Sequence, residues 1–479
     1  PTERRAAERD MRAGRIDGII STSALELGVD IGSLDVVVLN GYPGTVAATW
    51  QRFGRAGRRQ QASLGVLVAN SQPLDQYVVR HPDFFADATP EHARIAPDQP
   101  LVLFDHIRCA SFELPFEVGD AFGPIDPEVY LEALAETEVV HREGTRWEWI
   151  ADSYPAQAVS LRSVADGNFV VVDRSDGAQR IIAEVDYSAA ALTLYEGAIH
   201  MVQSTPYQVE RLDWEGRKAF VGRTYVDYYT DSIDFTKLKV LDHFDGCEAG
   251  RGDAHHGEVH VVRRVAGYKK IRYYTHENIG YGPVNLPDQE LHTTAAWWQL
   301  PQAVLLRAFA SKQDALDGFL GAAHALHVVA TVAVMADARD LQKSVGNGDG
   351  AWFATQDGSG HGRAQDADGK AVAIGGDASL AVAAGDVALV DATLVETAQF
   401  VPTVYLYDNF PGGVGLSEPL WQRQAELLQR ASELVERCDC AAGCPACVGP
   451  VLAVDEAKTL ATPKQLALQV LALLAEAAA

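Results

Sequence analysis

The strongest constraint on this chain is that four of its six cysteines fall within ten positions, as Cys438, Cys440, Cys444 and Cys447. Their spacing, C-x-C-x3-C-x2-C, suits one Zn2+ ion, because four thiolates can surround the ion tetrahedrally at about 2.3 Å. A site whose four positions are all filled by protein is structural rather than catalytic. Gly443 permits a sharp turn between the ligands, and Pro445 stiffens the loop.

Two other uses of four cysteines stay open. A 4Fe–4S cluster also takes four cysteine ligands, although it rarely draws all four from one tight loop. A disulfide pair needs an oxidising compartment. The chain opens with PTERRAAERDMRAGRIDG, which lacks the apolar core of a secretory signal, and it has no run of about 18 uncharged apolar residues. We therefore expect a cytoplasmic protein without a membrane span, and zinc is the preferred interpretation of the cysteines.

Length and charge set the next bounds. A chain of 479 residues is too long for one ordinary core, so about two to four domains are expected. A net charge of −25 and a pI near 4.9 argue against bulk binding of nucleic acid. The first sixty residues are nevertheless locally basic, with the arginine-rich stretches ERRAAERDMRAGR at 3–15 and QRFGRAGRR at 51–59. A local basic surface that binds nucleic acid is therefore compatible with the negative net charge of the whole chain.

The pattern of this N-terminal region predicts an α/β layout. Short apolar runs predict buried parallel strands at 18–22, 35–40 and 64–70, and the intervening patterns predict helices at 3–14 and 45–57. Ligand sites in such sheets lie at the carboxyl ends of the strands. The sequences STSALELGVD and YPGT fall at two of these ends, and QRFGRAGRR lies on the nearby helix.

These residues carry a specific resemblance. STSALELGVDIG is similar to motif V of superfamily 2 helicases and QRFGRAGRR to their motif VI, so residues 1–75 resemble the C-terminal part of a second RecA-like domain. The resemblance implies that Arg55 and Arg58 are arginine fingers on one helix face. It also implies nucleotide-site roles for Gly28, Asp30 and Gln51, and it makes Thr22 a donor to a DNA phosphate. The alternative is an exposed basic helix packed on an unrelated sheet.

Two expected helicase motifs are missing. No G-x-x-x-x-G-K-[ST] sequence and no D-E-x-H box occur in the 479 residues. The simplest account is that the chain is the C-terminal part of a longer protein, in which ATP and Mg2+ would be bound. Taken alone, it should not hydrolyse ATP, because a hydrolysis site needs both faces of the cleft.

The sequence pattern changes in the middle of the chain. Residues 76–123 predict a bridging segment with a helix at 101–115, residues 124–160 a winged-helix-like region, and residues 161–300 a mostly antiparallel β region. His106, Cys109 and Glu113 are interpreted as a helix face rather than a metal site, and the polar residues 253–256 as a loop tip. Aromatic and basic residues interleave, which suits either single-stranded nucleic acid or an ordinary sheet. They are Tyr225, Tyr228, Tyr229, Arg263, Arg264, Tyr268, Lys269, Lys270, Arg272, Tyr273 and Tyr274.

The last third, 301–479, predicts an α+β domain. Two apolar helices are expected within 300–341, loops or weak hairpins in the Gly- and Asp-rich stretch 344–400, and a strand, Gly-rich loop and helix over 401–437. The Gly-rich loop could cradle a phosphate or could be only a tight connection. His324 and His327 are expected in a core or surface role. Thr462 is a plausible N-cap for a final helix that begins at Pro463.

A second resemblance covers this end. YLYDNFPGGVGLSE, a helix, and CDCAAGCPACVGP together resemble the C-terminal domain of MrfA-type helicases, including its four-cysteine zinc site. The resemblance implies ATP-dependent, 3′-to-5′ unwinding of DNA in repair, with DNA that is single-stranded or has a 3′ overhang as partner. A repair nuclease is a further candidate partner. Lhr-type helicases share the early motifs but lack this cysteine-bearing end. The alternative is a zinc-bearing DNA-binding or protein-interaction module without motor activity.

Overall fold

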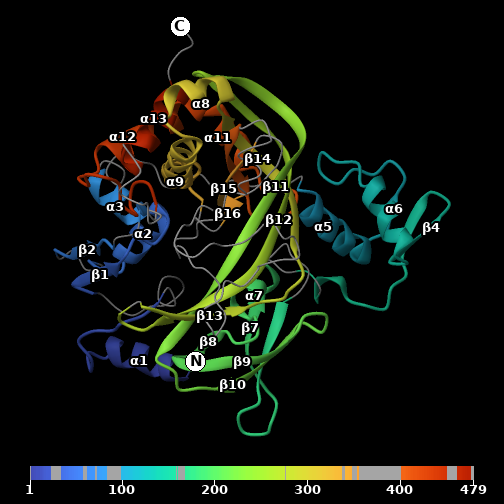
Figure 1. Cartoon of the computed structure of the whole chain (residues 1–479). Coiled ribbons are helices and arrows are strands. Elements are labelled where there is room, and N and C mark those ends of the chain that lie inside the picture. The colour runs from blue at the N-terminus through green and yellow to red at the C-terminus, as the bar shows by residue number, and fades with distance from the viewer. Residues whose placement is uncertain are drawn as a thin grey trace.

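The computed structural model describes residues 2–22, 34–57, 62–70, 73–82, 99–157, 159, 168–275, 277–336, 340–347, 353–354, 401–449 and 461–475. Three predicted site residues, Gly28, Asp30 and Arg58, lie outside these ranges, as does most of the stretch 344–400. The architecture is the expected α/β plus α+β multidomain arrangement (Figure 1).

The N-terminal module has a parallel pair of strands. Strand β1 (Val36–Asn40) pairs with β2 (Leu64–Val68), with helix α2 (Val46–Phe53) between them and α1 (Thr2–Arg12) before them. The two predicted strands at 35–40 and 64–70 are therefore confirmed as a parallel pair, but they are not buried as predicted. Four of their apolar side chains are 47–60% exposed, namely those of Val36, Val38, Leu64 and Val68. The strand predicted at 18–22 is wrong. No described strand pairs with these residues, and Ile20 is fully exposed, so its apolar side chain gains no burial.

The winged-helix-like module combines helices α5 (Pro100–Glu113) and α6 (Glu128–Glu136) with a small antiparallel sheet. The sheet has the order β3-β5-β4, with β3 at Phe116–Glu117, β4 at Val140–Glu143 and β5 at Arg146–Trp149. Ile107 of α5, Leu131 of α6 and Trp147 of β5 share one core. The helix expected in the bridging segment thus packs as part of this module. His106, Cys109 and Glu113 lie along α5, and they form no metal-binding group in the described structure.

A five-stranded sheet follows, in the order β7-β6-β10-β9-β8. Its strands are β6 (Asn168–Asp173), β7 (Arg180–Asp186), β8 (Ile199–Val202), β9 (Thr205–Asp213) and β10 (Lys218–Arg223), and helix α7 (Tyr187–Thr193) follows β7. Strands β6 and β7 form the hairpin predicted around residues 175–177. Phe169, Tyr195 and Val221 belong to a separate small core beneath this sheet.

The longest feature is a hairpin of β11 (Tyr228–Ala249) and β12 (Gly252–Arg272). At about 3.4 Å per residue, its 22-residue first strand spans about 75 Å. The hairpin runs from the five-stranded sheet to the C-terminal helices (Figure 1). It anchors a sheet in the order β15-β17-β14-β12-β11-β16, with β13 (Asn278–Pro283) beside β12. The remaining strands are β14 (Gln289–Gln299), β15 (Leu341–Asn347), β16 (Phe353–Ala354) and β17 (Pro402–Asp408).

The prediction of a polar loop tip at 253–256 is wrong. These residues lie inside β12, where Ala254 and His256 are buried and His255 stacks on Trp297 with ring centroids 5.5 Å apart. The turn comes earlier, at Gly250, whose φ of +60° favours glycine. The next amide, of Arg251, donates to the Leu473 carbonyl at 2.9 Å, so the hairpin tip docks on the last helix.

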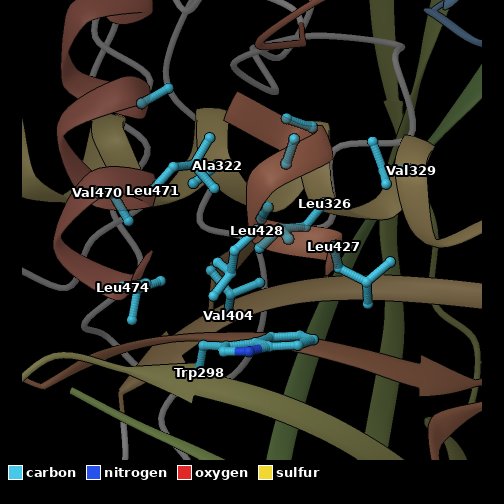
Figure 2. Close-up of a cluster of buried hydrophobic side chains, with 14 of the residues drawn as sticks. Trp298, Ala322, Leu326, Val329, Val404, Leu427, Leu428, Val470, Leu471 and Leu474 are labelled. Atoms are coloured by element: carbon cyan, nitrogen blue, oxygen red, sulfur yellow. The ribbon is translucent and has the colours of Figure 1, made fainter. Parts of the chain in front are cut away.

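The largest core surrounds helix α9 (Lys312–Val334). One side of α9 packs on the long sheet and the other on α12 (Gln424–Glu436) and α13 (Pro463–Ala475). Figure 2 shows Trp298 and Val404 of the sheet beneath Leu326, Leu428 and Leu471 of the three helices. Fully burying a large apolar side chain stabilises the fold by about 1.5–3 kcal/mol, so these contacts hold the C-terminal domain together.

Helix α9 is apolar enough to raise the question of a membrane. Its segment Asp314–Val334 has a mean hydropathy of 1.4, but 78% of that window is buried inside the protein. Gly318 explains how α13 approaches so closely, because a Cβ at this position would collide with the Leu466 carbonyl. The described part of the chain therefore uses α9 as a core helix.

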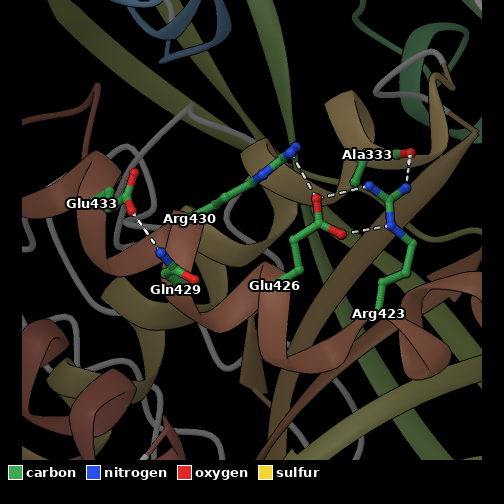
Figure 3. A network of polar contacts seen from close by, with 6 residues as sticks. All are labelled: Ala333, Arg423, Glu426, Gln429, Arg430 and Glu433. Atoms are coloured by element: carbon green, nitrogen blue, oxygen red, sulfur yellow. Dashed lines mark hydrogen bonds and ion pairs between the residues drawn. The ribbon is translucent and has the colours of Figure 1, made fainter.

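The single helix predicted after the Gly-rich loop is divided into α11 (Ser417–Gln422) and α12. Arg423 sits at the break and clamps Glu426 through two hydrogen bonds of 2.8 and 2.9 Å. Its third contact, 2.6 Å long, goes to the carbonyl of Ala333 near the end of α9 (Figure 3). The guanidinium thus satisfies a helix-end carbonyl and fixes α12 against α9.

Candidate metal centre

The structure brings the four clustered cysteines together directly after α12. All four Sγ atoms lie within 4.8 Å of one another, and Cys438 and Cys447 are buried. The separations are 3.6 Å for Cys438–Cys444, 3.5 Å for Cys440–Cys447 and 3.7 Å for Cys444–Cys447. All four thiols are free. The loop thus presents four sulfur donors to one point.

These distances fit a single tetrahedral ion. Ligands at about 2.3 Å from zinc lie about 3.8 Å from each other, close to the spacing found. A disulfide requires about 2.05 Å, and a 4Fe–4S cube needs its ligands spread around several metal and sulfide atoms. With four protein ligands the coordination sphere is full, which makes the centre structural.

Two cations that the sequence pattern did not reveal flank the sulfur atoms. Arg80, at the end of α3 (Pro73–Arg80), lies beside the Cys438 thiol. Burial alone would raise the pKa of Cys438, but the Arg80 guanidinium and the contacts with Cys440 and Cys444 lower it to about 6. Lys464 Nζ donates to the carbonyls of Cys438 and Cys440 at 2.6 and 3.2 Å. Since four thiolates around Zn2+ carry a net charge of −2, both cations favour the loaded centre.

The loop is held on both sides by helices. Thr462 caps α13 as predicted: its Oγ accepts from the Gln465 amide at 3.3 Å, and its own amide donates to the Gln465 side chain at 2.9 Å. On the other side, Tyr77 and Val78 of α3 are buried in the same core as α12. Helix α3 follows β2, so the cysteine loop contacts an extension of the N-terminal module.

The described motif V and VI residues lie at the edge of the N-terminal module. Gln51 is exposed on α2, and Thr22 is exposed ahead of the undescribed stretch 23–33. Arg55 does not lie on the helix, contrary to the prediction, because α2 ends at Phe53 and Gly54 caps it. The Arg55 carbonyl instead accepts from the Leu34 amide at 3.4 Å, which anchors the segment beside β1.

The Gly-rich loop after β17 is organised from within. Asp408, fully buried, accepts the amides of Val414 and Leu416 through Oδ2, at 2.8 and 3.0 Å. These donors are therefore already used, so the loop is a tight connection rather than an open phosphate cradle. Burial raises the pKa of the Asp408 carboxyl to about 6, and its Oδ1 has no hydrogen-bond partner in the described structure.

Asp408 should make stability pH-dependent. Its pKa is about 6 in the folded state against an ordinary 3.8, so the folded state binds more protons between these values. Stability therefore falls as pH rises from 4 to 6, by about 2 kcal/mol from this group. Asp408→Asn keeps an acceptor oxygen but does not titrate, and its denaturation midpoint should lack this decline.

The control for this experiment is Asp173→Asn. Hydrogen bonds from Ser175 outweigh burial and lower the pKa of Asp173, so its titration lies below the window. Chemical denaturation at a series of pH values should give the Asp173 variant the same slope as the unchanged chain between pH 4 and 6. Equal slopes for the Asp408 variant and the unchanged chain would contradict the role of Asp408.

The interleaved aromatic and basic residues separate into two groups. Tyr268 is buried and stacks on Tyr195 at 5.0 Å, and Lys269 is buried as well, so these belong to an ordinary sheet interior. Tyr225 and Tyr274 are 96% and 97% exposed just beyond the open end of the hairpin. Arg272 there pairs with Asp227 and Glu277 at 3.3 Å each. The exposed group is the one with rings open for stacking.

Three family models match separate parts of the chain. They are the helicase conserved C-terminal domain at residues 1–60, the winged helix domain of ATP-dependent helicase HRQ1 at 95–164, and the MrfA Zn-binding domain at 322–448. The last match contains the four cysteines and the Gly-rich loop. These regions follow the order of the modules in the fold.

Relatives that match most of this chain are also ATP-dependent helicases by name. The chain is 40% identical to the ATP-dependent helicase YprA of Bacillus subtilis over 96% of its own length and 55% of the relative. It is 31% identical to ATP-dependent helicase HRQ1 of Saccharomyces cerevisiae, over 68% of this chain and 31% of that one. A crystal structure of the DUF1998 helicase MrfA bound to DNA matches with a TM-score of 0.58 and 38% identity, over 99% of this chain and 56% of that chain.

The chain spans about half the length of YprA and of MrfA. Within that span, the three family models match this chain one after another, and the structure gathers the four cysteines inside the region matched by the MrfA Zn-binding domain. The chain therefore belongs to the MrfA-type family of ATP-dependent helicases with a zinc-binding domain.

Proposed function

We propose that the chain forms part of a superfamily 2 helicase that unwinds DNA in the 3′-to-5′ direction during DNA repair in the cytoplasm. The observation that carries the proposal is the joint presence of a helicase C-terminal domain and a gathered four-cysteine centre in one fold. A related structure of MrfA, 38% identical with a TM-score of 0.54, contains both DNA and AMPPNP. The chain would accordingly contribute to a site for DNA and for ATP with Mg2+.

In this proposal Arg55 and Arg58 act as arginine fingers. Phosphoryl transfer asks a protein mainly for positioning and for positive charge near the γ-phosphate, which guanidinium groups supply. Gly28, Asp30 and Gln51 would border the nucleotide and Thr22 would donate to a DNA phosphate. The zinc held by Cys438, Cys440, Cys444 and Cys447 would be structural. A repair nuclease is a candidate partner.

The test uses the chain alone. We expect weak binding of a fluorescein-labelled single strand, with affinity that falls steeply with salt because phosphate contacts release counterions. We also expect no ATP hydrolysis, since residues 1–479 contain no P-loop sequence. Anisotropy at several salt concentrations and a phosphate-release assay measure the two. Robust DNA-stimulated ATPase activity from this chain would refute the proposal that it supplies only one face of the ATP site and needs a P-loop domain for the other.

A zinc-bearing binding module without motor activity would behave differently in the longer protein. It would bind DNA but would show no strand separation when joined to a P-loop domain. A helicase assay with a 3′-overhang substrate and its 5′-overhang counterpart separates these functions and also tests the polarity. Unwinding of the 5′-overhang substrate alone would contradict the proposed direction.

A further inference from the structure

The winged-helix module exposes a cluster of aromatic side chains. Phe112 lies in the last turn of α5, Trp149 ends β5, and Tyr154 comes just before the 3-10 helix η2 (Pro155–Gln157). The Phe112 ring meets the other two rings edge to face, with centroids 5.5 Å and 5.3 Å away. Phe112 is 42% and Tyr154 is 55% exposed. These three residues form one connected surface, which we call the aromatic patch.

The rings of the patch are held in place before any partner arrives. The Trp149 indole N–H donates to the Ala151 carbonyl at 2.6 Å, and the ring packs on the core of the module. Leu114 and Ile150, next to the patch in the chain, are 74% and 53% exposed. Connected apolar surface of this kind marks an interaction site more often than single exposed residues do. Fixed aromatic rings also suit binding, because little side-chain freedom is lost when a partner packs on them.

The module that carries the patch is strongly acidic. Residues 99–157 contain twelve aspartates and glutamates, three arginines and no lysine, which gives a net charge of −9. Two of the arginines already pair with carboxylates of the module, Arg142 with Glu128 at 3.4 Å and Arg146 with Glu148 at 3.0 Å. The charge that the module presents to solvent is therefore negative.

Carboxylates lie beside the patch and along the second helix of the module. Glu113 and Asp152, which neighbour the patch in the chain, are exposed, whereas the third arginine, Arg108, has a buried Nε atom. Glu132 and Glu136 are exposed on α6, the helix that precedes the β4–β5 hairpin. In helix-turn-helix modules that bind DNA, the second helix enters the major groove between two rows of phosphates. Carboxylates in that position oppose such binding.

Charge decides which kind of partner the patch suits. Exposed aromatic rings can stack on a nucleotide base, enter a lipid surface or anchor a protein segment. Nucleic acids and anionic lipid surfaces both carry dense negative charge, so a module with a net charge of −9 repels them. A protein segment with lysines or arginines beside an apolar side chain is attracted instead, and it matches both properties of this surface.

The position of the module leaves the patch open. Figure 1 shows α6 and β4 on the opposite side of the long hairpin from α12 and α13. The module is attached at the start of α5, where the Gln99 side chain donates to the Pro411 carbonyl at 2.6 Å. Helix α5 has 14 residues, so Phe112 lies about 20 Å further along the helix. A partner on the patch would therefore leave the zinc-bearing helices uncovered.

We propose that the winged-helix module is a protein-docking module, and that its aromatic patch binds a basic segment of another protein. An apolar side chain of that segment packs on the Phe112 and Tyr154 rings, and neighbouring lysines or arginines pair with Glu113 and Asp152. The interaction depends on neither the ATP site nor the DNA contacts of the proposed function.

The experiment uses peptides as the partner. A phage-displayed library of random peptides is selected on the whole chain and counter-selected on the Phe112→Ala variant. We expect the enriched peptides to share an apolar residue flanked by lysines or arginines. The most enriched sequence is then synthesised with a fluorescein label, and anisotropy gives its Kd for the unchanged chain and for each variant.

Phe112→Ala and Tyr154→Ala should each weaken peptide binding by about tenfold or more, the usual effect of losing one aromatic anchor. Glu113→Gln combined with Asp152→Asn should weaken it a few-fold and flatten its dependence on salt, because exposed charges are screened. Tyr225→Ala is the matched control, since Tyr225 is an exposed aromatic residue outside the module. It should change the Kd by less than about twofold. Thermal melting checks folding, and the Tyr154 variant decides the result if the Phe112 variant is unstable.

A labelled DNA duplex represents the competing class of partner. Its binding should be the same for the unchanged chain, Phe112→Ala and Tyr154→Ala. DNA binding that falls in both patch variants would overturn the proposal in favour of a nucleic-acid surface. The proposal would also be overturned if no peptide is enriched, if the enriched peptides lack basic residues, or if all variants bind the peptide equally.

Discussion

Replacing Arg58 by alanine should lower DNA-stimulated ATP hydrolysis by about 10³-fold or more in a longer protein that joins this chain to a P-loop domain. The expected cause is the loss of a fixed positive charge from the γ-phosphate in the transition state, where it matters most. ATP binding should largely survive, because the P-loop side holds the nucleotide before reaction. Turnover of ATP and equilibrium binding of a labelled nucleotide give the two quantities.

The control for this prediction is Arg52→Ala. Arg52 lies on α2 three residues before Arg55, but the motif resemblance gives it no contact with the nucleotide. Its replacement should leave turnover within a few-fold of the unchanged protein. Near-normal hydrolysis by the Arg58 variant would rule out the arginine-finger assignment, and equal large losses in both variants would point to general damage of the N-terminal module.

Removing the metal should have the second large effect. We expect one zinc per chain by elemental analysis, and Cys444→Ser should lose it and lower the melting temperature by about 10 °C. The physical reason is that the ion fixes the cysteine loop, which directly follows α12 and whose Cys438 and Cys440 carbonyls accept hydrogen bonds from Lys464 of α13. Without the ion, the four Sγ atoms, which lie within 4.8 Å of one another, lose the shared ligand that holds them at this spacing.

Cys109→Ser is the matched control, because Cys109 is a half-buried free thiol that is remote from the cluster in sequence and lies on α5, a helix of the winged-helix core. It should retain the zinc and the melting temperature. In the longer protein, Cys444→Ser should reduce unwinding more than ATP hydrolysis, since the defect lies in an accessory domain. Iron in place of zinc, or a metal-free protein of unchanged stability, would overturn this assignment.

The contact of Arg80 with Cys438 refines where the damage should appear. Helix α3 joins the N-terminal module to the cysteine loop, so loss of zinc should loosen α3 together with α12 and α13. Hydrogen exchange is expected to rise in all three helices, while β1 and β2 keep their protection. This pattern would show that the centre braces the contact between two modules.

The sequence alone predicted those features that depend on residues close together in the chain. The cysteine spacing, the Thr462–Pro463 helix start and the apolar runs of β1 and β2 each depend on residues close together in the chain, so their patterns predicted the elements. The order of the modules and the family also followed from motifs that lie within short segments. In each case the chemistry of neighbouring residues is the physical cause.

Only the tertiary structure decided the features that depend on distant partners. The expected strand at 18–22 finds no described partner, and residues 253–256 look like a polar loop although burial against Trp297 makes them a strand. Arg80 reaches Cys438 across more than 350 positions, and the aromatic patch brings Phe112 of α5 against Trp149 of β5. Composition and spacing do not predict such contacts, because the contacts form only when separate elements pack together and exclude water.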